Sequence, residues 1–351
     1  MKYIIYEGYS KEGKYNAGSK AREDIEHILT NLSFKPFKIP TNDCIQKQKS
    51  KKIIQYFGYI KNYFIWKKHV KRLHKSDVVV IQYPIMFTFG NVLKWLHKKG
   101  VMTIAIIHDI ESIRLIGTKS LHKMRADYED KNLLKLFDKV ISHNGKMTSE
   151  LLKYGIDKEK IINLGIFDYL YQNKIDSSKR KNDKSIIIAG NLSSEKAYYL
   201  KKLNNIRNVK FNLYGKGVDF ELSRNIEYKG CFLPSELPQV LEGSFGLVWD
   251  GKSIDCISGS FGNYMKYNNP HKISLYLASE IPVIVSTESA LSNFVIENKI
   301  GIAVKSLKEL EVKIGKLSKE EYDDMLANVR KLAKKIRNGY FLTKSINTII
   351  K

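Results

Sequence analysis

The chain has 351 residues, of which 43% are hydrophobic, so it is long enough for two domains of ordinary size and its composition is that of a folded protein. Its 60 basic and 36 acidic residues give a formal net charge of +24, which indicates a polyanionic partner such as nucleic acid, an anionic membrane surface or a phosphorylated substrate. Three widely separated cysteines, Cys44, Cys231 and Cys256, argue against a disulfide framework and for a reducing compartment.

Neither a membrane-spanning helix nor a signal peptide is predicted. No stretch approaches the ~20 consecutive apolar residues of a spanning helix. The apolar run within 1–7 is too short for a signal peptide. We therefore expect a cytoplasmic protein, and a peripheral position on the inner face of the membrane stays open.

The first half of the chain alternates between strand and helix patterns. Buried strands show as short apolar runs, whereas helices show apolar residues at a spacing of three or four. Because alternating strands and helices form a parallel sheet, this half predicts a doubly wound α/β domain over 1–170. The predicted elements are a strand at 2–6, a helix at 19–32, a strand at 77–83, a helix at 92–99, a strand at 101–107, a strand at 139–142 and a helix at 146–154.

A polar, charged stretch at 171–184 is the predicted linker, and the same alternation restarts after it. We expect a second doubly wound domain over 185–325 and C-terminal helices over 326–351. Whether these helices pack back on the N-terminal domain stays open. Ser318 and Glu321 fit a capping box in this tail. The predicted elements are strands at 185–189, 209–214, 245–249, 282–285 and 301–304, then helices at 318–337 and 340–350.

The segment around Pro270 gives the strongest indication of a ligand. A polar and aromatic loop from Tyr264 leads into Pro270, which suits the first turn of a helix. His271 and Lys272 follow beside the free N–H groups of that turn, where a cation opposes the helix dipole unless an anion binds there. Because a buried strand follows at 282–285, we predict a phosphate-bearing ligand at the carboxyl edge of the second sheet.

Two other strand ends in the second half supply candidates for the same ligand. Gly190 allows a tight exit from the strand at 185–189, and Lys196 beyond it could contact a phosphate or could simply be solvated. Tyr214, at the end of the next strand, could pack on a nucleobase or ribose, with room provided by Gly215. Since all of them follow strands of one half, we expect them to share one ligand.

In the first half, the loop after the first strand passes through Asn16, Gly18 and Ser19 into a helix. Small residues let the backbone approach a ligand, and a helix start favours negative charge. The pattern matches neither a dinucleotide fingerprint nor a Walker loop. A plain turn with a helix cap therefore explains it as well.

Polar residues gather where the strand at 101–107 ends. His108 and Asp109 follow it directly, and Arg114 comes soon after. In an α/β sheet this edge faces the ligand crevice, so Asp109 could accept a proton from an acceptor hydroxyl or hold a sugar hydroxyl, and Arg114 could hold an anionic acceptor. Alternatively, Asp109 and Glu111 cap the next helix.

A basic, aromatic-rich segment lies at 47–75. Between Asp43 and Asp77 there are nine lysines, one arginine and six aromatic residues but no acidic residue. An amphipathic helix of this composition suits an anionic membrane surface, although a core-packing helix with solvent-facing lysines fits the same pattern. Basic and aromatic residues together can also bind single-stranded nucleic acid, but no recognised motif accompanies them, so no nucleic-acid partner is predicted.

Metal and nucleophile motifs are absent from the sequence. No D-x-D or other acidic pair has the spacing of a divalent-metal site. There is no G-x-S-x-G nucleophile elbow. We therefore expect neither a metal nor a cofactor.

Several of these motifs together resemble bacterial GT-B glycosyltransferases. The nearest group comprises the streptococcal glucosyltransferase 3-like enzymes and the β-1,6-galactofuranosyltransferases of surface polysaccharide assembly, and the resemblance spans nearly the whole chain. It implies an α/β fold of two Rossmann-like, doubly wound domains that face a central cleft, with a C-terminal helical tail. The motifs are Asn16–Ala21, His108–Arg114, Gly190–Leu192, Leu213–Gly217 and Lys266–Lys272.

The resemblance also implies roles for single residues. A UDP-sugar donor would bind mainly to the second half, with Lys272 and Lys196 at its diphosphate and Tyr214 on its nucleoside side. Many retaining GT-B enzymes have a glutamate pair where this chain has Tyr267 and Leu275, so the stereochemical outcome stays open. The donor-binding candidates are Asn16, Gly18, Gly190, Lys196, Tyr214, Gly215, Asn268, Asn269, His271 and Lys272; the acceptor-binding candidates are His108, Asp109 and Arg114; the catalytic candidates are Asp109 and Lys272.

We interpret the chain as a metal-independent glycosyltransferase that moves a hexose, glucose or galactofuranose, from a UDP-sugar to a hydroxyl of a glycan or lipid-linked glycan. A lysine at a helix start can stabilise the leaving diphosphate as its charge rises in the transition state. The alternative is a non-catalytic nucleotide-sugar-binding partner of a glycosyltransferase complex. Association into homo-oligomers stays open in both cases.

Overall fold

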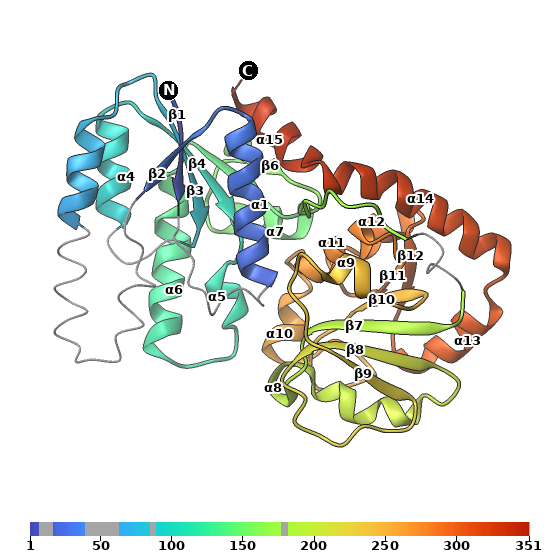
Figure 1. Cartoon of the computed structure of the whole chain (residues 1–351). Helices are drawn as coiled ribbons and strands as arrows, with labels where there is room; N and C mark the ends of the chain where they lie inside the picture. The colour runs from blue at the N-terminus through green and yellow to red at the C-terminus, as the bar shows by residue number, and fades with distance from the viewer. Residues whose placement is uncertain (7–16, 39–62, 85–88, 177–181, 351) are drawn as a thin grey trace. The chain divides into compact units, whose positions relative to one another are not determined.

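The computed structural model describes residues 1–6, 17–38, 63–84, 89–176 and 182–350 (Figure 1). Among them, unit 1 contains 1–6, 22–164 and 342–350, and unit 2 contains 17–21 and 165–341. This division differs from the predicted one at two places. The larger segment of unit 2 begins at Gly165 and so includes the described part of the predicted linker, and most of the last helix groups with unit 1.

The described part of unit 1 is built on a six-stranded parallel sheet with the order β2-β1-β3-β4-β5-β6. β3 and β4 lie in its middle and are buried beyond their first residues, which explains their uninterrupted apolar sequences. β1 lies between β2 and β3, with Ile4 opposite both Pro36 and Val80. The strands are β1 (Lys2–Tyr6), β2 (Lys35–Lys38), β3 (Val78–Tyr83), β4 (Met102–Ile107), β5 (Lys139–Ser142) and β6 (Ile161–Asn163).

Helices connect the strands of this unit, as expected for a βαβ series. α6 has a clear start signal, since the side chain of its N-cap Ser120 accepts a hydrogen bond from the N–H of Lys123. The helices are α1 (Ala17–Asn31), a helical stretch at 63–71, α4 (Phe89–Lys98), α5 (Glu111–Arg114), α6 (Leu121–Asn132), α7 (Gly145–Lys153), α15 (Tyr340–Ile350) and the 3₁₀ turns η2 (Leu134–Leu136) and η3 (Lys158–Lys160).

Unit 2 has a second six-stranded parallel sheet in its described residues, with the order β12-β11-β10-β7-β8-β9. The strand order reverses at β7, because the chain adds β8 on one side of it and β10 on the other. Ligand crevices of open α/β sheets form at such a point, outside the carboxyl ends of the strands. The strands are β7 (Ser185–Asn191), β8 (Lys210–Lys216), β9 (Ile226–Gly230), β10 (Phe245–Val248), β11 (Val283–Ser286) and β12 (Gly301–Val304).

Short helices connect most of these strands, and one long helix follows the last of them (Figure 1). The helical elements are α8 (Ser194–Ala197), η5 (Tyr198–Asn205), α9 (Leu237–Val240), α10 (Gly259–Tyr264), α11 (His271–Ala278), α12 (Ser292–Glu297), η6 (Leu307–Glu309), α13 (Leu310–Lys316) and α14 (Lys319–Arg337). Two doubly wound parallel units with C-terminal helices confirm the predicted α/β fold class. Every strand that the sequence analysis predicted is present, with ends shifted by at most about two residues.

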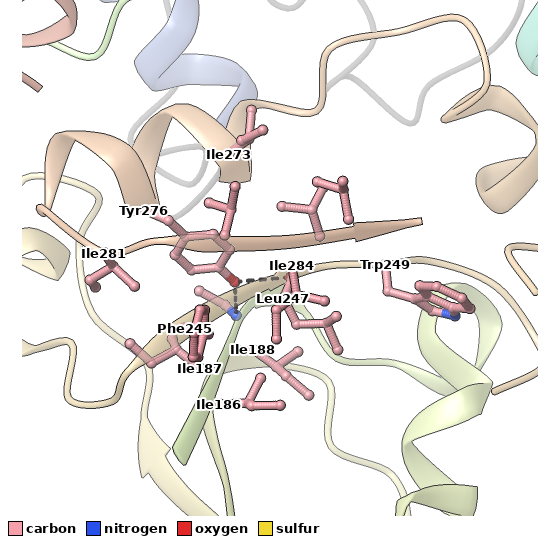
Figure 2. Packing of buried hydrophobic residues seen from close by; sticks show 14 of the residues in the cluster. Ile186, Ile187, Ile188, Phe245, Leu247, Trp249, Ile273, Tyr276, Ile281 and Ile284 are labelled. Carbon is pink, nitrogen blue, oxygen red and sulfur yellow. Dashed lines mark hydrogen bonds between the residues drawn. The ribbon is translucent and has the colours of Figure 1, made fainter. Parts of the chain in front are cut away.

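Tyr276 on α11 fixes that helix against the sheet of unit 2 (Figure 2). Its hydroxyl accepts a hydrogen bond from the N–H of Ala189 on β7 at 2.8 Å and donates to the carbonyl of Leu247 on β10 at 3.4 Å. The ring lies against Gly246, where a Cβ would come within 2.2 Å of it, so any larger residue would displace the helix. The position of α11 is therefore set by β7, where the strand order reverses, and by its neighbour β10.

Glu280, just after α11, anchors α14. Its carboxylate lies 2.8 Å from Nη2 of Arg337 and 3.3 Å from Nε of Arg330. The helix begins at a complete capping box, in which the side chain of Ser318 accepts from the N–H of Glu321 and the Glu321 side chain accepts from the N–H of Ser318. The capping box that the sequence predicted is thus confirmed.

Candidate active site

Three charged side chains converge at the carboxyl edge of the unit 2 sheet. Lys196 comes from α8 after β7, Asp250 follows β10, and Lys272 lies in the first turn of α11. Nζ of Lys272 lies 2.8 Å from Oδ1 of Asp250 and 3.1 Å from the carbonyl oxygen of Trp249. Nζ of Lys196 lies 3.8 Å from Oδ2 of Asp250. One carboxylate therefore holds two ammonium groups beside the reversal point of the sheet.

Backbone hydrogen bonds brace the loop that carries this carboxylate. The N–H of Gly251 donates to the carbonyl of Lys196 at 2.9 Å, and the N–H of Tyr199 donates to the carbonyl of Gly251 at 3.2 Å. Gly251 has a φ of +121°, and a Cβ there would lie 2.2 Å from the carbonyl oxygen of Ser258, so the position requires glycine. The loop after β10 is thus tied to α8 by its backbone as well as by charge.

Lys272 is the more buried of the two lysines, with 13% of its side chain exposed against 29% for Lys196. Burial lowers the pKa of the Lys272 ammonium below its ordinary value. The carboxylate of Asp250 acts in the opposite direction, and the charge of Lys196 adds to the lowering. The Lys272 ammonium therefore points into unit 2 and away from bulk solvent, where its charge depends on its neighbours.

The start of α11 lies next to this group. Pro270 is the N-cap of the helix, one position before the first-turn place that the sequence predicted, and it provides no side-chain cap hydrogen bond. The first N–H groups of a helix carry a partial positive charge that attracts anions. Lys272 adds a full positive charge at the same end.

His271 is not a second cation at this helix start. Burial lowers its pKa to about 3, and the nearby ammonium of Lys20 adds to the effect, so the ring is neutral. It stacks on Tyr169 with 5.2 Å between ring centroids, and neither ring nitrogen has a hydrogen-bond partner among the described residues. His271 can therefore offer a ligand a neutral hydrogen bond only.

The glycines at the ends of β7 and β8 meet directly across the sheet, with Gly190 opposite Gly215. Both have positive φ, +133° and +145°, and a Cβ on Gly215 would lie 1.8 Å from the carbonyl oxygen of Gly190. Close packing of the two strands therefore already requires glycine at 215. At Gly190 a Cβ would meet no atom of the described residues within 4 Å, which leaves space there for a ligand.

The structure contradicts the predicted role of Tyr214. Its ring is 2% exposed and belongs to the core of unit 2. Its hydroxyl donates to the carbonyl of Val240 at 3.2 Å and accepts from the N–H of Glu242 at 3.0 Å. A side chain held in this way cannot pack against a nucleobase or ribose, because its position in the strand directs it into the core.

The two asparagines before Pro270 differ in their surroundings. Asn269 is 3% exposed, and its side-chain amide donates to the carbonyl of Gly165 at 2.9 Å, which holds the loop within unit 2. Oδ1 of Asn268 is buried and has no hydrogen-bond partner among the described residues. An unsatisfied buried oxygen of this kind makes Asn268 the better of the two candidates for contact with a ligand.

The predicted acceptor residues lie together at the edge of the unit 1 sheet. Nε2 of His108 lies 2.7 Å from Oε1 of Gln82. Nη1 of Arg114 lies 3.4 Å from Oδ2 of Asp109 and 3.0 Å from Oε1 of Glu111. The N-cap of α5 is Ile110, so the alternative in which Asp109 caps this helix is wrong, whereas Glu111 does lie in its first turn.

Some predicted candidates lie outside what the structure describes. Asn16 is one of them. Gly18 belongs to α1, but the structure does not describe what surrounds it. Of the basic segment at 47–75, only 63–75 is described: Trp66 is buried in unit 1, whereas Phe64 is 59% exposed. The core-packing alternative therefore holds for part of this segment, and an exposed aromatic residue remains on its surface.

Asp250 is the site residue that the sequence analysis did not single out. The available signal was its place as an acidic residue directly after the predicted buried strand at 245–249. In the described part of the chain, no three His, Cys, Asp or Glu residues are placed to hold a metal ion. Within the same residues, none of the helices has the length and apolar character needed to cross a membrane.

Comparison with known proteins identifies the family. A model of the glucosyltransferase 3-like N-terminal domain matches residues 2–166, and a model of the C-terminal domain matches 186–349. The chain is 34% identical over 282 residues to the β-1,6-galactofuranosyltransferase WbbI of Escherichia coli (strain K12), which covers 79% of this chain and 80% of that protein. It is 27% identical over 287 residues to glucosyltransferase 3 of Streptococcus parasanguinis, with 79% and 81% covered.

Solved structures agree on the fold. The apo form of the lipopolysaccharide outer core galactosyltransferase WaaB superposes with a TM-score of 0.62 at 12% identity, over 99% of each chain. The pneumococcal O-GlcNAc transferase GtfA, solved with UDP and GlcNAc, gives a TM-score of 0.51 at 18% identity, over 81% of this chain and 58% of that one. With both of its units matched in sequence and its GT-B fold shared, the chain belongs to the glucosyltransferase 3-like family of glycosyltransferases.

Proposed function

We propose that this protein transfers a hexose, glucose or galactofuranose, from a UDP-sugar to a hydroxyl of a glycan or lipid-linked glycan in the assembly of bacterial surface polysaccharide or glycoprotein, without a metal ion. The observation that carries the proposal is the largely buried ammonium of Lys272 at the start of α11, beside the reversal point of the unit 2 sheet. The sugars are those named in the relatives, a galactofuranosyltransferase and two glucosyltransferases.

In the reaction, the bond between the anomeric carbon and the diphosphate breaks, and a bond to the acceptor oxygen forms. Negative charge grows on the leaving diphosphate, so cations that are already in place stabilise the transition state more than the ground state. Lys272, Lys196 and the N–H groups at the start of α11 would supply that positive charge. Asn268 and His271 would contribute neutral hydrogen bonds to the donor.

The acceptor would be held at the edge of unit 1. Asp109 would take the proton of the attacking hydroxyl, and Arg114 and His108 would hold the acceptor glycan. The support is their common place after β4, at the carboxyl edge where α/β sheets bind ligands.

The direct test is a donor screen with purified protein and acceptor glycans. UDP-glucose and UDP-galactofuranose would be compared with UDP-galactose and UDP-N-acetylglucosamine, each with and without EDTA, and released UDP would be measured. We expect release with one of the first two donors and no effect of EDTA. Binding of a UDP-sugar without any release would instead indicate a non-catalytic partner subunit, and loss of activity in EDTA would contradict metal independence.

We also propose a weak association with anionic membranes through residues 47–75. Within the described part of this segment, Phe64, Lys67, Lys68 and Lys71 are exposed, a combination suited to an anionic interface. Lys67→Glu, Lys68→Glu and Lys71→Glu together should reduce co-sedimentation with phosphatidylserine vesicles, whereas Lys331→Glu with Lys334→Glu on α14 should not. Equal binding to anionic and neutral vesicles would count against the proposal.

A further inference from the structure

Asp250 is the buried carboxylate at the centre of the donor site. Only 7% of its side chain is exposed, and its two oxygens face two different lysines, Lys272 and Lys196. We propose that Asp250 is a positioning residue that keeps these two ammonium groups side by side and keeps Lys272 charged, so that a diphosphate meets two fixed cations. This inference deepens the proposed function and rests on it for the identity of the anion.

The contacts of the Lys272 ammonium show why it depends on this carboxylate. Its hydrogen bonds go to Oδ1 of Asp250 and to the carbonyl oxygen of Trp249. Without the carboxylate, a largely buried ammonium would keep only the neutral carbonyl, and an unpaired buried charge is strongly disfavoured. Lys272 would then lose its proton more readily, and a neutral amine cannot stabilise a leaving diphosphate.

No other described group near Lys272 can replace Asp250. Lys196, facing the site from α8, carries the same sign as Lys272 and opposes its protonation. Tyr199 of η5 and Tyr276 of α11 lie near Asp250, but burial raises the pKa of both phenols, so both stay neutral between pH 6 and 9. His271, the neighbour of Lys272 in the chain, is neutral as well.

Asp250 is placed to act through the lysines and not on the substrate. A carboxylate that faced a diphosphate directly would repel it, whereas here both carboxylate oxygens face cations and the group is largely buried. The braced backbone around Gly251 holds the carboxylate in place before any ligand arrives. The role is therefore one of preorganisation, which a substitution can remove without removing a substrate contact.

The test uses Asp250→Asn, which keeps the shape and removes the charge. Because Lys272 is charged at low pH and loses its proton as pH rises, UDP binding measured by calorimetry at pH 6 should be as tight as in the native protein, or tighter. At pH 8.5 binding should be several-fold weaker than in the native protein, because without the carboxylate part of the Lys272 population is then neutral. Asp255→Asn, an exposed aspartate in the same loop paired with Lys308, is the matched control and should change neither value.

A second variant separates charge from structure. In Asp250→Asn with Lys272→Arg, the guanidinium stays protonated throughout this range. The ratio of UDP affinities at pH 6 and pH 8.5 should therefore return to that of Lys272→Arg alone. A merely structural role of Asp250 predicts that Asp250→Asn weakens UDP binding equally at both pH values. That result, or a ratio in the double variant that differs from that of Lys272→Arg alone, would overturn the proposal.

A third measurement needs no substrate. The rate at which acetic anhydride acylates Lys272, followed by mass spectrometry against pH, reports the fraction of neutral amine. Asp250→Asn should move this curve to lower pH, and Asp255→Asn should leave it in place. A shifted curve in a protein that never releases UDP would support the role of Asp250 and refute the proposed function, whereas an unshifted curve in an active enzyme would refute the role alone.

Discussion

The two sheets present positive charge at their carboxyl edges in different ways. In unit 2, Lys272 is 13% exposed and lies 2.8 Å from the largely buried carboxylate of Asp250. In unit 1, Arg114 is 39% exposed and is shared between Asp109 at 3.4 Å and Glu111 at 3.0 Å. One edge thus has a fixed cation in a largely buried pair, and the other has a cation that is partly solvated.

The two kinds of ion pair suit different kinds of ligand. A buried ion pair cannot open without leaving a charge unpaired, so the cation of unit 2 stays in one place and suits a constant group such as a diphosphate. A partly exposed pair contributes only about 0–1 kcal/mol and can rearrange easily. The edge of unit 1 would therefore suit the proposed acceptor, which must enter, react and leave as a longer glycan.

The largest effect should come from removing the fixed cation. Lys272→Ala should lower turnover by about 10²–10³-fold, the range found when one preorganised donor to a developing anion is lost. Lys272→Arg should retain more activity because it keeps the charge. UDP release measures both, and Lys334→Ala on the exposed face of α14 is the control. Near-native turnover in the alanine variant would mean that the fixed cation does not stabilise the leaving group.

The next effect should come from the acceptor edge. Asp109→Asn keeps the size of the side chain but cannot accept a proton, so turnover should fall by about 10²-fold or more. The Michaelis constant for the UDP-sugar should stay close to native, since the donor site is untouched. Asp157→Asn, on an exposed turn of the same unit, serves as the control. Unchanged turnover in Asp109→Asn would assign the proton transfer to another group.

The same contrast between buried and exposed positions explains how much of the fold could be predicted from the sequence. Central strands such as β3 and β10 are buried on both faces and appear as apolar runs, and they were located to within a residue. The edge strands β2, β6 and β9 were missed. Pro36 interrupts the first, the second has only three residues, and charged residues alternate in the third. An edge strand needs fewer apolar residues and so leaves a weaker pattern.

The candidate site shows a similar limit. The helix start at Lys272 could be predicted because Pro270 and the following apolar strand mark it locally in the sequence. The pairing with Asp250 could not, since the two residues are 22 apart in the chain and meet only after β10 and β11 pair. The role predicted for Tyr214 was wrong because the direction of a strand side chain depends on the register of the strand. The position of Tyr214 in the sequence does not fix that register.

Each unit also buries a neutral histidine at the carboxyl edge of its own sheet. The histidine of unit 1 predicts that the stability of the protein depends on pH. His143 is 1% exposed, and burial lowers its pKa from 6.5 to about 4. The unfolded chain therefore binds more protons between these two values, so stability falls as pH drops below about 6.5. From pH 7 to pH 5 this one group should cost about 2 kcal/mol of unfolding free energy.

Urea unfolding of His143→Gln at both pH values checks this. The amide can still donate to the carbonyl of Ile107, which His143 contacts at 2.9 Å. The variant should lose less stability than the native protein on going to pH 5, by about the same 2 kcal/mol. His122→Gln, at a site 67% exposed, should leave the pH dependence as it was. An identical pH dependence in His143→Gln would show that this ring is not the group that titrates.

The smallest effect should come from the partly solvated cation, Arg114, and it completes the comparison of the two edges. Arg114→Gln removes a charge from a half-exposed network, so unfolding free energy should change by less than about 1 kcal/mol. Any functional effect should then appear as a raised Michaelis constant for the acceptor glycan, with turnover at saturation close to native, because a rearrangeable contact contributes to binding in the ground state and the transition state alike. A turnover loss as large as that of Lys272→Ala would mean that the edge of unit 1 is as rigidly preorganised as that of unit 2, and the distinction between a fixed donor site and an adaptable acceptor site would have to be given up.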